Sequence, residues 1–188
     1  SKGKSQRLNT AMAASHLVLL LVPVADSAPT HVFSVADYGA AGDGSRYDTV
    51  AFQATVNACG EARGGRVVLP ALRDYLTVTM HLRSRVVLEL APARLLGGTR
   101  QHDHPAERRR WYIVLAENTT GAGVTSGGEI NGQGGAFVVM PSDQKNVMVS
   151  WNTMGHCRGD ECCPRLIGFI DSKDVTIHGI TLNQPAYW

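Results

Sequence analysis

Val124-Thr125-Ser126-Gly127-Gly128 returns later in the chain as Val175-Thr176-Ile177-His178-Gly179, with Val, Thr and Gly in register. The offset is 51 residues, which we interpret as two turns of a coil of about 25 residues each, a period typical of solenoids. The strands around this repeat are not joined by two-residue hairpin turns, and parallel stacked strands need none. The repeat therefore predicts an all-β solenoid, with a β-sandwich as the alternative.

Short strands and one helix fill the rest of the chain. A helix is predicted from Asp48, its N-cap, to Cys59, because Ala51, Phe52, Thr55, Val56 and Cys59 form one apolar stripe and Gly60 then ends it. This helix is expected to cover the open end of the coil. Strands are predicted at residues 32–35, 66–70, 75–79, 85–90, 111–115, 146–150, 166–170 and 175–182.

Composition excludes several classes of protein. The 188 residues are 44% hydrophobic and 18% charged, which excludes a disordered or collagen-like chain. The formal net charge of +2 comes from residues 1–27, which hold Lys2, Lys4 and Arg7 against Asp26. Because the remainder is neutral, no nucleic-acid partner is expected.

The N-terminal region predicts secretion. Residues 11–24 form an apolar run that is shorter than the roughly 20 residues a membrane span needs. Basic residues precede it and small residues follow, which is typical of a signal peptide cut after Ser27; a buried core segment is the alternative. We therefore expect a presegment at 1–27, one domain at 28–188, an extracellular or cell-wall location, and no membrane contact after cleavage.

Two chemical modifications fit that compartment. The cysteines Cys59, Cys157, Cys162 and Cys163 are disulfide candidates, with three connectivities if all four pair. A zinc site using His156 and these thiols is the alternative, but the spacing lacks paired C-x2-4-C motifs. Asn118-Thr119-Thr120 is an N-glycosylation acceptor, so Asn118 is a candidate glycan site.

Several motifs together resemble the polygalacturonase family, glycoside hydrolase family 28, of plant type, whose members are pectin-lyase-like right-handed parallel β-helices. They begin with Val35-Ala36-Asp37-Tyr38-Gly39-Ala40, Gly42-Asp43-Gly44 and Asp48-Thr49, followed by residues 64–70 and Gly128-Glu129-Ile130-Asn131-Gly132-Gln133-Gly134, and they end with residues 164–169 and 175–183. The resemblance covers about residues 32–188. It departs at Asn131, where the family usually has Asp, and at Ala136-Phe137, where the family often has a Trp pair.

The resemblance implies an inverting hydrolase of α-1,4-galacturonan, with pectin as partner and no cofactor or metal. Its catalytic N-T-D, D-D, G-H-G and R-I-K motifs do not occur in this sequence. We therefore expect them downstream of Trp188, in a longer enzyme that is monomeric at full length, and we expect this chain to be inactive and to end on an open rung. A pectin lyase on the same fold, or a non-catalytic carbohydrate-binding or structural module, is the alternative.

No local group replaces the missing catalytic residues. Asp37, Asp43, Asp48, Asp171 and Asp174 fit turn or cap roles, Asp160-Glu161 lies among cysteines, and Glu129 is expected to face solvent. His102-Asp103-His104 could bind a metal but has no evident third ligand, so a solvated loop is expected there. Arg108-Arg109-Arg110 is also expected to be a solvated loop, with a galacturonate-binding edge as the alternative.

Overall fold

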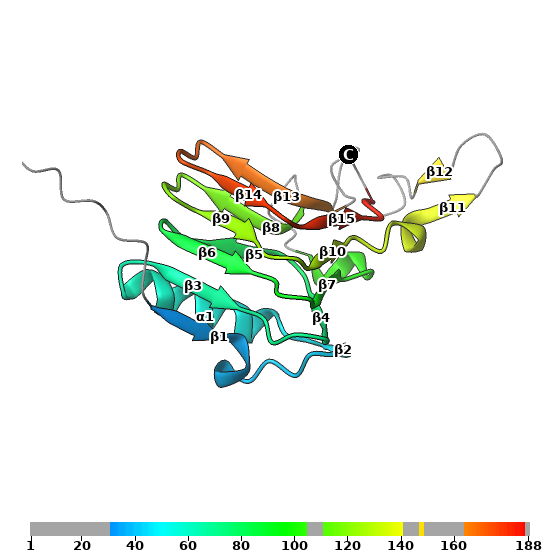
Figure 1. Cartoon of the computed structure of the whole chain (residues 1–188). Coiled ribbons are helices and arrows are strands. Elements are labelled where there is room, and N and C mark those ends of the chain that lie inside the picture. The colour runs from blue at the N-terminus through cyan, green and yellow to red at the C-terminus, as the bar shows by residue number, and fades with distance from the viewer. Residues whose placement is uncertain (1–30, 105–110, 141–146, 149–163, 187–188) are drawn as a thin grey trace, which may run out of the picture.

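The chain is a right-handed parallel β-helix, as the sequence predicted, in a computed structural model that describes residues 31–104, 111–140, 147–148 and 164–186 (Figure 1). Three parallel sheets form its walls. Sheet A contains β1 (Val32–Ser34), β3 (Gly65–Val68), β6 (Val86–Glu89), β9 (Gly123–Thr125) and β14 (Thr176–His178). Sheet B contains β2 (Asp43–Tyr47), β4 (Asp74–Thr77), β7 (Arg94–Gly97), β10 (Glu129–Asn131) and β15 (Thr181–Asn183). Sheet C contains β5 (Met80–Leu82), β8 (Tyr112–Glu117) and β13 (Arg165–Ile170).

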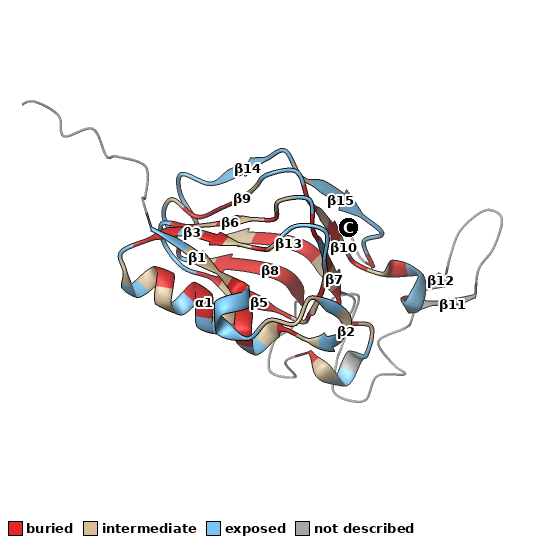
Figure 2. Cartoon of the chain, turned by 60° about the horizontal axis from the view of Figure 1, so that its bottom comes forward, coloured by how far each residue is buried: buried red, intermediate tan, exposed pale blue. Residues whose placement is uncertain are grey.

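The helix α1 (Thr49–Glu61) caps the first coil, as expected. It takes the place that a sheet C strand occupies in the next coil, and it packs against β1, β3, β5 and β6. Its buried residues are those of the predicted stripe, and Figure 2 shows them as buried segments along the helix. The predicted end at Gly60 is wrong, because the helix continues to Glu61 and the turn is made by Arg63 and Gly64, both with positive φ.

The interpretation of the 51-residue repeat as two turns is also wrong. Strands β9 and β14 are direct neighbours, and Val124 pairs with Ile177, so the repeat is a single turn with an offset of 53 residues. The equivalent offset is 36 residues from β6 to β9 and 21 from β3 to β6. The last turn is long because the chain has an insertion between β10 and β13, of which residues 141–146 and 149–163 lie outside the described part.

Part of that insertion is irregular or antiparallel. It begins with a 3-10 helix, η3 (Gly134–Phe137), and continues into β11 (Val138–Met140), which pairs antiparallel with β12 (Val147–Met148). The strand predicted at 146–150 is therefore not a coil strand. The predicted strand ranges also leave out six short strands, β2, β5, β7, β9, β10 and β11. The segment predicted as one strand at 175–182 is two strands separated by Gly179.

The core is built from rows of inward side chains stacked one coil above another. One row runs Val67, Leu88, Val124 and Ile177, and a second runs Tyr75, Leu95, Ile130 and Leu182. The first three members of each row are fully buried, whereas Ile177 and Leu182 are each 51% exposed. These two side chains, with Phe169 and Pro185, line a recess of about 440 Å³ on the last coil. Strands β14 and β15 are thus more exposed than the strands of the preceding coils (Figure 2).

Two 3-10 turns complete the described fold. The first, η1 (Val35–Tyr38), follows β1 and packs against α1, and the second, η2 (Gln101–Asp103), follows β7. No helix in the described part of the chain is long and apolar enough to cross a membrane.

Candidate functional site

Sheet B carries a polar ladder on its outer face. Because side chains alternate along a strand, the inward positions of Tyr75, Leu95 and Ile130 turn their neighbours outward. Register pairs Asp74 with Arg94 and Arg94 with Glu129, on three successive coils. Two residues further along the strands, Asn131 pairs with Asn183. We define the polar ladder as Asp74, Arg94, Glu129, Asn131 and Asn183.

An ion pair fixes the first half of the polar ladder. Nε of Arg94 donates to Oδ1 of Asp74 at 2.7 Å, and a second guanidinium nitrogen contacts Oδ2, so the pair is bidentate. These hydrogen bonds hold the pKa of Asp74 below its usual value and raise the pKa of Arg94. Asp74 is therefore ionised at neutral pH and is not a proton donor.

Amide side chains fix the second half of the polar ladder. Oε1 of Glu129 accepts a hydrogen bond from Nδ2 of Asn131 at 2.9 Å and another from Nδ2 of Asn183 at 3.0 Å. Oδ1 of Asn131 in turn accepts from the backbone N–H of Gln133 at 2.9 Å. Nε2 of Gln133 donates to the carbonyl of Gly97 at 2.6 Å. The three adjacent side chains are thus held in one arrangement across two coils.

This arrangement suits binding better than catalysis. Hydrolysis of a glycosidic bond needs one carboxylic acid to protonate the leaving oxygen and one carboxylate to activate water. Asp74 is neutralised by Arg94, and Glu129 already accepts two hydrogen bonds, so neither is arranged as the acid. Carboxylate and amide groups in a fixed row are instead suited to hydrogen-bonding sugar hydroxyls.

A second polar cluster lies where the strands β2 and β7 end. Nε of Arg100 donates to Oδ2 of Asp103 at 2.8 Å, and the guanidinium lies 5.5 Å from the centre of the Tyr47 ring. The hydrogen bond from Tyr47 is the main cause that lowers the pKa of Asp103. Burial, and then Asp103, raises the pKa of Tyr47. Arg100 and Asp103 neutralise each other, so this cluster offers no free charge.

His104 beside it is a core residue rather than part of a solvated loop. Its ring stacks on Trp111 at 4.8 Å, and Nε2 lies 3.1 Å from the carbonyl of Gly98, to which it donates. Burial lowers the pKa of His104, and its Nδ1 is buried without a hydrogen-bond partner. Among the described residues no group of three His, Cys, Asp or Glu side chains is arranged to hold a metal ion.

The remaining predicted site residues are the glycosylation candidate and the cysteines. Asn118 is exposed in a turn after β8, with φ of +52°, and its glycosylation stays a prediction. Cys59 lies buried in the core beneath α1 without a disulfide partner among the described residues, and burial raises its pKa to about 11. Its pairing with Cys157, Cys162 or Cys163 stays a prediction. Several predicted segments and residues lie outside the described part of the chain: 1–27, Arg108-Arg109-Arg110, His156, Cys157, Asp160-Glu161, Cys162 and Cys163.

The carboxylates that the sequence analysis excluded as catalytic residues have structural roles. Asp171 and Asp174 have positive φ in a turn, and Asp43 accepts hydrogen bonds from Ser45 and Arg46. Sequence reasoning missed Asp74, Arg94 and Asn183. The sequence signal was weak, a single charged residue directly before two apolar ones in 74–76 and in 94–96, and only the register brings these residues together.

Comparisons with known proteins agree with this architecture. A "putative glycosyl hydrolase" of Parabacteroides merdae superposes with a TM-score of 0.70 and 25% identity over 83% of this chain. An exopolygalacturonase of Thermotoga maritima gives 0.64 and 16% over 85%, and a family 28 exopolygalacturonase of Yersinia enterocolitica gives 0.64 and 20% over 84%. The chain spans 66%, 43% and 35% of those three chains, respectively. No family model and no curated protein matches the sequence.

Proposed function

We propose that this chain belongs to a secreted glycoside hydrolase of the polygalacturonase type, which hydrolyses α-1,4-galacturonan with inversion. The observation that carries the proposal is the polar ladder, placed on the outer face of a β-helix similar to those of polygalacturonases. The sequence motifs that resemble the same family support it independently. Since one fold hosts several activities, the substrate is the part of the proposal that most needs testing.

In this proposal the glycan lies along sheet B and across its coils. Neighbouring strands are about 4.8 Å apart, so a ladder that crosses several coils can contact more than one sugar of an extended chain. The polar ladder then orients the polysaccharide, and the acid and the base are supplied by other residues. An inverting mechanism requires those two carboxyl groups to be far enough apart to hold a water molecule.

Two measurements on the 188-residue chain test this proposal. Binding to polygalacturonate is measured by affinity electrophoresis, and hydrolysis is measured by the release of reducing ends. We expect binding that weakens when Asn183 is replaced by alanine, because Glu129 then loses a donor and the glycan loses an amide contact. We expect no release of reducing ends. Failure to bind any pectic glycan would refute the proposal, and hydrolysis would refute the non-catalytic role of the polar ladder.

A non-catalytic carbohydrate-binding module is the second candidate. It is favoured by the arrangement of Asp74 and Glu129, neither of which is arranged as a general acid. The two candidates differ in one requirement: the hydrolase needs a catalytic acid and base elsewhere in the protein, and the binding module needs neither. A gene product that binds pectin but never releases reducing ends would favour the module.

Secretion is a separate part of the proposal. Expression in a secreting eukaryotic host, followed by N-terminal sequencing, should show cleavage after Ser27. The same product should lose mass on treatment with an N-glycosidase, because Asn118 is exposed. The variant Asn118→Gln should show no such loss, and an unchanged mass for the original chain would contradict the glycosylation.

A further inference from the structure

We propose that Leu76 and Leu96 form an apolar platform against which the C–H face of one sugar ring of the glycan packs, beside the polar ladder that binds hydroxyls of the same glycan. This inference rests on the proposed function, since it concerns the polysaccharide that the proposal places along sheet B. It deepens that function because it assigns the apolar part of the contact, which the hydrogen bonds of the polar ladder do not supply.

The two leucines lie next to each other on the outer face of sheet B. Register pairs Leu76 on β4 with Leu96 on β7. Side chains alternate along a strand, and the neighbouring residues Tyr75, Thr77 and Leu95 are buried inside the coil, each at most 1% exposed. Leu76 and Leu96 therefore face outward, and both are half-buried outside the core cluster.

Polar groups border the apolar platform. Asp74 and Arg94 precede the two leucines by two residues on the same strands, so their ion pair runs parallel to the platform at a distance of about 6.6 Å. On the next coil Asn131 is in register with the platform, and on the first coil Tyr47 is. The platform is thus a small apolar area inside a frame of polar and aromatic side chains.

A pyranose ring has the matching division of its surface. Its carbons present C–H groups on a face of the ring, and its hydroxyls project from the edge. Packing the C–H groups against the leucines removes apolar surface of both partners from water, which is favourable. Asp74 and Arg94, although paired, keep lone pairs and N–H groups that can bind the hydroxyls. Such a combination of an apolar wall with a few fixed polar groups is typical of ligand sites.

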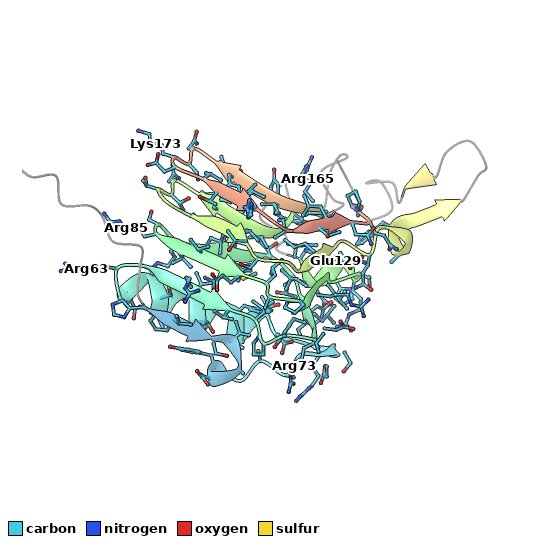
Figure 3. The ribbon with its side chains drawn as sticks, viewed as in Figure 1. Arg63, Arg73, Arg85, Glu129, Arg165 and Lys173 are labelled. Carbon is cyan, nitrogen blue, oxygen red and sulfur yellow. The ribbon has the colours of Figure 1, made fainter. Side chains whose placement is uncertain are left out.

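The charges around the apolar platform are compatible with galacturonate. Figure 3 shows Arg73, Glu129 and Arg165 on the same side of the coils. Arg73 directly precedes Asp74, is exposed, and donates a hydrogen bond to the carbonyl of Ala41 at 3.0 Å. No carboxylate among the described residues is paired with it. A sugar carboxylate therefore meets cations as well as Glu129, and an anionic glycan is not repelled.

The test is a calorimetric titration of a galacturonate oligomer into the 188-residue chain. Leu96→Asn replaces the leucine with a polar side chain of similar shape and should weaken binding about three- to eightfold, the factor for losing roughly 30–50 Å² of buried apolar surface. Leu76→Asn should act in the same way. Leu96→Met keeps an apolar side chain of similar volume and should bind within about twofold of the original chain.

Two further readouts separate the platform from a merely structural role. Binding should have a negative heat-capacity change, which marks burial of apolar surface, and Leu96→Asn should make it less negative. The loss of affinity should persist in added salt, because the leucines are uncharged.

Val50→Asn is the matched control, since Val50 is 83% exposed on α1, and it should leave the affinity and the heat-capacity change as they are. Circular dichroism checks that each variant is folded. If neither asparagine variant of the platform is folded, the original chain decides, because a heat-capacity change near zero would overturn the platform.

The outcomes distinguish the two proposals. Unchanged affinity in both Leu76→Asn and Leu96→Asn would overturn the apolar platform. Self-association of the chain that these two variants abolish would overturn it too, because a second copy would then cover the leucines. The proposed function stands in either case as long as Asn183→Ala weakens binding. Failure to bind any pectic glycan would overturn both proposals.

Discussion

Replacing Asp48 with alanine removes a carboxylate that ties the first loop of the coil to the start of α1. The side chain is only 3% exposed. Oδ1 accepts a hydrogen bond from the backbone N–H of Ala41 at 2.6 Å, and Oδ2 accepts one from Gly42 at 3.2 Å. The sequence predicted Asp48 as the N-cap, and it does hold that position, but its carboxylate bonds to the preceding loop and not to the helix.

The expected loss follows from these two bonds. A hydrogen bond to a charged group contributes about 1.5–3 kcal/mol, and a donor left buried without a partner costs about 1–3 kcal/mol. We take the lower value for a hydrogen bond to a charged group, about 1.5 kcal/mol, for each of the two partly buried donors. Asp48→Ala should then lose about 3 kcal/mol of unfolding free energy. Asp48→Asn keeps one acceptor oxygen and should lose about half as much. For a chain of this size, 1 kcal/mol shifts the melting temperature by about 2–4 °C, so Asp48→Ala should melt about 6–12 °C lower.

Urea unfolding followed by circular dichroism measures these losses. Asp37→Ala is the matched control, because Asp37 lies nearby on η1 and is exposed, so its loss should stay within about 0.5 kcal/mol. The reasoning fails if Asp48→Ala is as stable as Asp37→Ala, or if Asp48→Asn is less stable than Asp48→Ala.

Three further predictions concern the core and its packing. Gly128→Ala should destabilise the fold by about 1–3 kcal/mol or more, because an added Cβ would lie 2.4 Å from Cβ of Leu90 and 2.5 Å from the carbonyl of Ala91; Gly127→Ala, which meets no atom within 4 Å but has φ of +66°, should cost about 1 kcal/mol, and a reversed order in urea unfolding would contradict this packing. His104 has a lowered pKa, so its neutral form stabilises the fold above the unfolded pKa of about 6.5, and this stability is lost as the pH falls below that value. His104→Phe should therefore lose less unfolding free energy than the original chain between about pH 7 and about pH 5, and equal losses would exclude this titration. In a chain with serine at Cys157, Cys162 and Cys163, the Cys59 thiol should resist a thiol reagent at about pH 8 and react on unfolding, because its pKa is about 11; rapid reaction of the folded chain would show that the thiol is accessible.

The fold class was predicted from the repeat, the strands without hairpin turns and the family resemblance, whereas the capping helix was predicted from a local pattern. The apolar stripe of α1 and the strands without hairpin turns were both visible in single segments. The corners of the coil were harder to predict, since many are made by non-glycine residues with positive φ, such as Arg85, Ala91 and Ser126. Such residues give no turn signal, and the boundaries of several strands were missed for this reason.

The candidate site was less predictable than the fold because it depends on register between distant segments. Glu129 and Asn183 are 54 residues apart and share a hydrogen bond. Their contact follows from the length of the insertion between β10 and β13, which no local pattern reveals. Glu129 was expected to face solvent, and it does lie on the outer face, but its two amide partners could be identified only from the structure.

The unequal turns of the coil mean that the number of residues and the height of the solenoid are independent quantities. A turn of 21 residues and a turn of 53 each add one strand to sheet A, and hence the same step of about 4.8 Å. The extra residues of the longest turn leave the coil directly after β10, beside Glu129 and Asn131. Insertions and deletions at that corner can remodel the border of the outer face of sheet B while the spacing of the polar ladder stays constant, so related chains of very different length can present the same row of side chains.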